Sequence, residues 1–168
     1  MATSDANERT GNGEIMGKDL TTSQNDRQNI LNNRYVLEQA ETYLSLGGIE
    51  FNDESVFTKQ QVMELFDISD ATIERFLATN AEELKSNGYR LLKGEKLKTF
   101  KSLAYGTLIN EGTKTSVLGV FNFRAVLNLG MLLTDSERAK ELRSRLLDIV
   151  IDVLAARAGG HTKFINQR

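Results

Sequence analysis

The stretch from Thr58 to Glu83 constrains the fold of this chain more than any other. Residues 58–61 read TKQQ, the pattern of a capping box, in which Thr58 is the N-cap of a helix and Gln61 reaches back to it. The apolar residues that follow have the spacing of one buried helical face: Val62, Leu65 and Phe66. The sequence therefore predicts a short helix directly after Thr58.

A break and a second helix follow. Asp67-Ile68-Ser69 interrupts the helical spacing, and Ser69 is a suitable N-cap for a helix that buries Ile73, Phe76 and Leu77. Two short helices joined by three residues, one of them apolar, are the layout of a helix-turn-helix. We therefore expect a helix-turn-helix over residues 58–83.

The segment before this motif divides into a polar part and a periodic part. Residues 1–30 are rich in Asn, Thr, Ser, Gly and Asp and poor in aliphatic residues, so we expect a flexible tail. From Asn33 an apolar stripe predicts a helix that ends at Gly47-Gly48. A short extended piece is expected from Ile49 to Phe57.

The segment after the motif is expected to form a wing. Asn87-Gly88 reads as a helix stop and turn, and residues 89–97 (YRLLKGEKL) resemble a short hairpin with Gly94 at its tip. Residues 114–120 (KTSVLGV) are rich in β-branched residues and predict a further strand.

The C-terminal part is expected to be helical. Phe121 to Leu133 is a strongly apolar helix candidate, and Thr134-Asp135-Ser136-Glu137 has the pattern of a capping box for a long helix to about Arg157. The predicted fold class is α+β, mainly helical. A winged helix-turn-helix (58–100) is followed by a strand-helix-helix unit (114–158), both within one domain over residues 31–168.

The charge of the chain is distributed unevenly. Residues 51–84 hold eight acidic and two basic residues, whereas residues 85–128 hold eight basic and two acidic ones. Because lysine and arginine contacts to phosphates supply most sequence-independent affinity for DNA, the second segment is the expected source of that affinity. The cations that we assign to phosphates are Lys85, Arg90, Lys93, Lys96, Lys98 and Lys101.

The second helix of the motif offers the side chains for reading bases. Its outward positions that suit base edges are Thr72, Arg75, Thr79 and Asn80. Arginine pairs well with a guanine edge and asparagine with an adenine edge in the major groove. Asp70 and Glu74 lie on the same helix, and there they would face phosphates unfavourably.

The sequence indicates neither an enzyme nor a cofactor protein. Cysteine is absent and His161 is the single histidine, so thiolate and histidine-cluster metal sites are excluded. The acidic pairs Glu82-Glu83 and Asp148/Asp152 lack a histidine or a third acid beside them. No apolar run reaches the ~20 residues of a membrane span, and the N-terminus has no signal-peptide pattern, so a cytoplasmic location is expected.

Three blocks of the chain carry a resemblance to a known class of proteins. They are FTKQQVMELFDISDATIERFL, EELKSNGYRLLKGEKL, and VFNFRAVLNLGMLLTDSERAKELRSRLLDIVIDVL with GGHTKFINQR. They resemble the DNA-binding N-terminal region of bacterial and phage Fic/Doc-associated or virulence-associated (RhuM-like) proteins. The last block is also similar to the end of Bro-N and KilA-N phage antirepressor domains. The aromatic and proline residues usual in the antirepressor helix are absent here.

This resemblance implies a DNA-binding regulator of transcription or of antirepressor type, attached to a downstream effector segment. His161 does not match the Fic motif, since the required anion loop does not follow it. The predicted partner is double-stranded DNA. The alternative is a protein-interaction module that docks an effector, a repressor or another copy of itself without DNA contact. The helix over residues 135–157 either packs on the Phe121–Leu133 helix or forms the seam of a homodimer.

Overall fold

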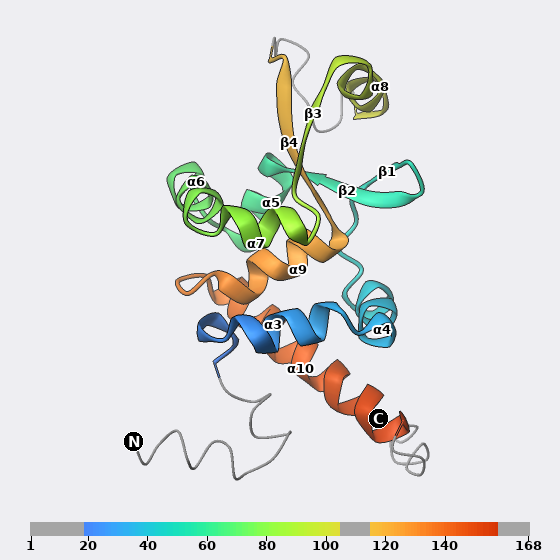
Figure 1. Cartoon of the computed structure of the whole chain (residues 1–168), viewed down its shortest axis with the longest axis vertical. Coiled ribbons are helices and arrows are strands. Elements are labelled where there is room, and N and C mark those ends of the chain that lie inside the picture. The colour runs from blue at the N-terminus through green and yellow to red at the C-terminus, as the bar shows by residue number, and fades with distance from the viewer. Residues whose placement is uncertain (1–18, 105–114, 158–168) are drawn as a thin grey trace.

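The fold is built around a four-stranded antiparallel sheet whose strands come from distant parts of the sequence (Figure 1). The computed structural model describes residues 19–104 and 115–157. Within these ranges the chain is mixed α+β and mostly helical, as expected for its class. The strand order is β1-β2-β4-β3, and the strands are β1 (Ile49–Phe51), β2 (Glu54–Thr58), β3 (Arg90–Lys93) and β4 (Val117–Asn122).

Side chains alternate between the two faces of this sheet, and each face has its own apolar core. On one face Val56, Leu92 and Val120 pack under α8 (Gly94–Ala104), together with Phe51 and Phe100. On the other face Phe57 and Phe121 join the larger core formed with the remaining helices. The sheet therefore separates α8 from the helix-turn-helix.

The two short helices predicted after Thr58, with a break at residues 67–69, are present. Helix α5 (Lys59–Phe66) begins with the expected capping box, and Ser69 caps α6 (Asp70–Thr79) through the backbone N–H of Thr72. Asp67 ends α5 in the left-handed conformation, and the N–H of Ile68 donates to the carbonyl oxygen of Met63 at 3.0 Å. A third short helix, α7 (Ala81–Ser86), follows and ends at the expected turn.

The expected extended piece before the motif is a hairpin. Strands β1 and β2 pair with Ile49 opposite Val56, and both turn residues, Asn52 and Asp53, have positive φ. Helix α4 (Arg34–Leu44) precedes it and starts where the sequence predicts, and the Asn33 side chain caps it.

The prediction of a flexible tail to residue 30 is wrong for its last part. A 3₁₀ turn η1 (Leu20–Thr22) and helix α3 (Gln24–Leu31) bury Leu20, Ile30 and Leu31 in the larger core. These three aliphatic residues hold the polar segment on the fold. Arg27 adds a fourth buried contact, since its ion-pair partner lies on α7. Residues 1–18 lie outside the described part.

The prediction of a wing hairpin at residues 89–97 is also wrong. After β3 the chain enters α8 at Gly94, whose φ of 62° opens a helix and not a hairpin tip. The apolar residues Leu97, Phe100 and Ala104 have helical spacing and cover the sheet. The pairing partner of β3 is β4, with Leu91 opposite Gly119.

The C-terminal helices differ from the expectation at their starts. Phe121 and Asn122 belong to β4, and the Asn122 side chain caps α9 (Phe123–Leu132). Ser136, and not Thr134, begins α10 (Glu137–Arg157), since its Oγ accepts from the N–H of Ala139 at 3.0 Å. The same hydroxyl donates to the carbonyl oxygen of Phe66 at 2.7 Å and so fixes α10 to the end of α5.

Candidate nucleic-acid interface

Helix α6 presents the side chains that the sequence assigns to base reading. Arg75 and Thr79 are exposed, and the Arg75 guanidinium lies 5.0 Å from the centre of the Phe76 ring. Thr72 is half-buried and its hydroxyl is within 3.1 Å of the Ser69 hydroxyl. Asn80 is half-buried at the end of the helix. Arg75 and Thr79 are therefore the two accessible members of this group.

A lysine on α5 neutralises the acidic side of α6. The Lys59 ammonium lies 2.8 Å from an Asp70 carboxylate oxygen and 2.5 Å from one of Glu74. Burial alone would lower the pKa of Lys59, but its hydrogen bonds to Asp70 and Glu74 raise it. The two carboxylates that would repel phosphates are thus paired inside the motif, a relation the sequence analysis missed because it joins two helices.

Tyr89 connects α6 to the strand pair β3–β4, called the ribbon below. Its ring packs on Phe121 with centroids 4.8 Å apart, and a Cβ atom on Gly119 would lie 2.2 Å from its hydroxyl oxygen. Burial raises the pKa of Tyr89, the nearby charge of Glu74 adds to this, and Lys59 opposes it. Tyr89, which directly precedes β3, therefore lies within electrostatic range of Glu74 on α6 and of Lys59 on α5.

The part of the ribbon beyond Tyr89 carries exposed apolar side chains beside a lysine. Leu91 is 50% exposed and Val117 is 41% exposed. Lys93 is exposed directly opposite Val117 in the ladder, and Leu91 is opposite Gly119. Directly opposite residues of an antiparallel pair lie on the same face. We call the four residues Leu91, Lys93, Val117 and Gly119 the ribbon face.

The other predicted phosphate ligands do not lie on this face. Arg90 points to the α8 side, where it pairs with Glu54 at 3.1 Å. Lys96 and Lys98 are exposed on α8, and the Lys101 ammonium donates to the carbonyl oxygen of Thr115 at 3.0 Å. Lys85 is exposed on α7. The structure thus brings Lys93 to the α6 side of the sheet and places Arg90, Lys96, Lys98 and Lys101 on or beside the opposite side.

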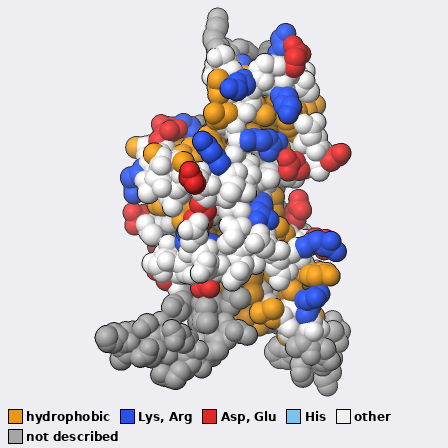
Figure 2. Space-filling model, in the orientation of Figure 1, with side chains coloured by type: hydrophobic (Ala, Val, Ile, Leu, Met, Phe, Trp, Pro, Cys, Tyr) orange, Lys and Arg blue, Asp and Glu red, His pale blue; other side chains and the backbone are white. Residues whose placement is uncertain are grey.

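The surface view shows how these charges are spread (Figure 2). Basic side chains recur over the upper part of the molecule, which holds the ribbon and α8, with hydrophobic and acidic side chains among them. Acidic and basic side chains also lie close together over the part that holds α6.

A buried polar network holds α7 and the N-terminal segment against α9. Arg27 donates from Nε and Nη2 to the two carboxylate oxygens of Glu83 at 2.7 and 2.8 Å, and Asn128 donates to Glu83 at 2.7 Å. Burial opposes the ionisation of Glu83, yet these hydrogen bonds outweigh it and lower its pKa. Glu83 is therefore an anion that joins α7 to α3 and α9.

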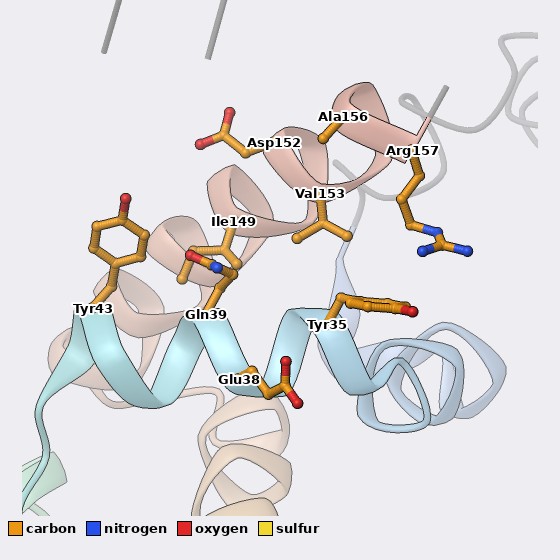
Figure 3. Close-up of a pocket in the computed structure, with 9 residues that line it drawn as sticks. All are labelled: Tyr35, Glu38, Gln39, Tyr43, Ile149, Asp152, Val153, Ala156 and Arg157. Carbon is orange, nitrogen blue, oxygen red and sulfur yellow. The ribbon is translucent and has the colours of Figure 1, made fainter. Parts of the chain in front are cut away.

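An apolar groove lies between α4 and the C-terminal half of α10 (Figure 3). It has a volume of about 250 Å³ and is lined mainly by apolar atoms, with Tyr35 and Tyr43 on α4 facing Ile149 and Val153 on α10. The Arg157 guanidinium lies 4.4 Å from the Tyr35 ring centre and closes one end. The helices that line this groove lie in the lower part of the molecule in Figure 1, and the ribbon lies at the top.

The comparisons with known proteins add no family to this description. No protein-family model, curated protein or solved structure matches the chain. Among the described residues there is no cluster of three or more metal-ligating side chains, and no helix there combines the length and apolarity of a membrane span. His161 lies outside the described ranges.

Proposed function

We propose that the chain binds double-stranded DNA and acts as a regulatory domain, with α6 in the major groove and the ribbon beside it. The observation that carries this proposal is the capped pair α5–α6, with Arg75 and Thr79 exposed on α6 and with Lys59 pairing the acidic side chains of that helix. A helix-turn-helix of this kind, accompanied by a strand with an exposed lysine, is a geometry suited to a duplex. Regulation of transcription is the role that the sequence resemblance implies.

The proposal divides the work between two sets of side chains. Arg75 and Thr79 are exposed on α6 and reach base edges, with Arg75 suited to guanine O6 and N7. Lys59 keeps Asp70 and Glu74 from repelling the phosphates. The phosphates are held by lysines on both sides of the ribbon: Lys93 on the α6 side, and Lys96 and Lys98 on α8. These lysines contact the phosphates on both sides of the groove that the ribbon approaches.

A salt series tests this proposal. We expect the chain to bind a duplex of about 20 base pairs with an affinity that falls steeply as salt rises. Replacing Lys93, Lys96 and Lys98 by alanine should reduce the slope of log affinity against log salt by up to about 2.7, since each phosphate contact contributes about 0.9. Lys140→Ala on α10 is the control and should leave the slope unchanged.

Arg75→Ala separates base reading from phosphate contact. It should weaken binding to a selected target by about 1–3 kcal/mol and weaken binding to random duplex far less. If the parent chain shows no salt-sensitive association with any duplex at low salt, DNA binding is the wrong function.

A second candidate function, self-association through α10, has its own supporting observation. Ile151 and Leu154 are exposed on α10, and with the half-buried Leu147 they recur at four- and three-residue spacing. This spacing suits a helix-helix seam between two copies. Sedimentation velocity of the parent and of Ile151→Glu tests it: a dimer that becomes a monomer supports the seam, and a parent that stays monomeric at high concentration rejects it.

A further inference from the structure

We propose that Leu91 and Val117 form an apolar wedge that enters the DNA minor groove next to α6 and bends the duplex. This inference rests on the proposed DNA binding and specifies how the ribbon engages its partner. It concerns the ribbon face, which no helix of the described residues covers on the α6 side.

The first support is the geometry of the two side chains. Leu91 and Val117 point from the same face of adjacent strands and are 50% and 41% exposed. Directly across the ribbon from Leu91 is Gly119, over which the Tyr89 hydroxyl lies. Leu91 is nevertheless half exposed on this face, whereas its neighbour Leu92 is buried under α8. A projecting aliphatic side chain on a thin support can reach the floor of a narrow groove.

The second support is the charge around the wedge. Lys93 lies opposite Val117 on the same face, and Lys96 and Lys98 are exposed on α8 just behind the ribbon. An apolar tip with one lysine beside it and two more across the sheet matches a groove whose floor is formed by base edges and sugars and whose walls are phosphates.

The same charge argues against a second copy of the chain as the occupant. Strand β3 is at the edge of the sheet, and an edge strand can pair with its copy. Antiparallel pairing of two β3 strands would bring Arg90 and Lys93 of one copy close to the same two residues of the other copy. Charged edge residues of this kind oppose edge-to-edge association.

The proposed wedge predicts a dependence on the mechanics of the DNA. Apolar side chains enter most easily where bases unstack readily, at pyrimidine–purine steps such as TA, and the duplex bends away from the inserted side chain. A duplex with a TA step beside the α6 site should therefore bind more tightly than one with a stiff A-tract at the same place.

The test uses end-labelled duplexes of about 20 base pairs and energy transfer between their ends. Binding of the parent chain should raise the transfer efficiency, and Leu91→Ala should remove most of this rise. We expect Leu91→Ala to weaken binding about tenfold at constant salt without changing the salt slope, because it deletes apolar contact and no charge. Leu103→Ala is the matched control, since Leu103 is a 55% exposed leucine on α8.

The outcomes separate this inference from the proposed function. The wedge is overturned if binding is salt-sensitive but the two DNA ends do not approach each other. It is also overturned if Leu91→Ala and Leu103→Ala have equal effects. In both cases the proposed DNA binding stands. Absence of any complex overturns both. Circular dichroism and the urea midpoint of each variant show whether the fold is retained. If Leu91→Ala does not fold, Leu91→Thr, which suits a strand and is polar, gives the same readout.

Discussion

Replacing Arg27 by methionine should destabilise the fold strongly, because it leaves a carboxylate buried without its cation. The side chains of Arg27 and Glu83 are each 6% exposed, so water cannot take over the lost contacts. Arg27 makes two charge-assisted hydrogen bonds to Glu83 and two more to the carbonyl oxygens of Leu20 and Thr21, at 2.8 and 3.1 Å. Of the hydrogen bonds described for the Glu83 carboxylate, the one from Asn128 remains after the change.

The expected magnitude follows from the cost of breaking such a pair. Removal of one partner of a buried ion pair costs about 3–5 kcal/mol, a large part of the 5–15 kcal/mol that stabilises an ordinary domain. With a urea dependence of about 2 kcal/mol per molar, the unfolding midpoint should fall by about 2 M. Urea titration followed by far-ultraviolet circular dichroism measures this. The double variant Arg27→Met/Glu83→Gln should recover at least about half of the loss, because no buried charge remains.

The pH dependence gives an independent check with a defined sign. In the parent the pKa of Glu83 is lowered, so this group adds stability above the ordinary carboxyl pKa of about 4.3 and loses it as pH falls through the lower folded value. In Arg27→Met burial acts without the cation and raises the pKa of Glu83. The deficit of the variant should then be largest near neutral pH and shrink on acidification. A midpoint shift below about 0.5 M at neutral pH, with unchanged slope, would refute the described burial of the pair.

Three further predictions concern single positions. Gly88→Ala should cost about 2–4 kcal/mol, because Gly88 has a φ of 122° and a Cβ atom there would lie 2.0 Å from the Asn122 oxygen that caps α9; the urea midpoint measures it. Ser136→Ala should cost about 2 kcal/mol, since it removes the cap of α10 and the bond to Phe66, whereas Thr134→Ala should change little. The raised pKa of Tyr89 should make stability fall as pH rises above about 10, and Tyr89→Phe should reduce that fall in alkaline urea titrations; an identical fall in both proteins contradicts it.

The parts of the fold that the sequence predicts correctly are those decided by near neighbours. Thr58 and Ser69 cap helices through backbone N–H groups three residues away, so their patterns are readable in the sequence. The end of α10 at Arg157 is as predicted, whereas α4 ends at Leu44, before the expected Gly47-Gly48. The two short helices and the break between them could therefore be predicted from local signals.

The errors arise where a distant partner decides. The N-terminal segment looked unstructured because Arg27 gains its partner 56 residues later. The expected hairpin at Gly94 failed because β3 pairs with β4, and residues 94–104 fold as α8 against the other face of the sheet. For the same reason the predicted phosphate ligands were treated as one group, although the sheet places Lys93 on one side and Arg90 on the other.

The position of β4 in the middle of the sheet has a consequence for synthesis of the chain on the ribosome. Strand β3 pairs with β4 alone, and β2 also needs β4 to cover its second edge. Until residues 117–122 have emerged, the helix-turn-helix can form its local turns, but β3 has no ladder and α8 has only part of its apolar support. A nascent chain or a truncated product that stops at residue 104 would thus expose unpaired strands and Phe100, which favours aggregation. Strand β4 completes the ribbon, so the proposed DNA-binding surface cannot fold before residues 117–122 have been synthesised.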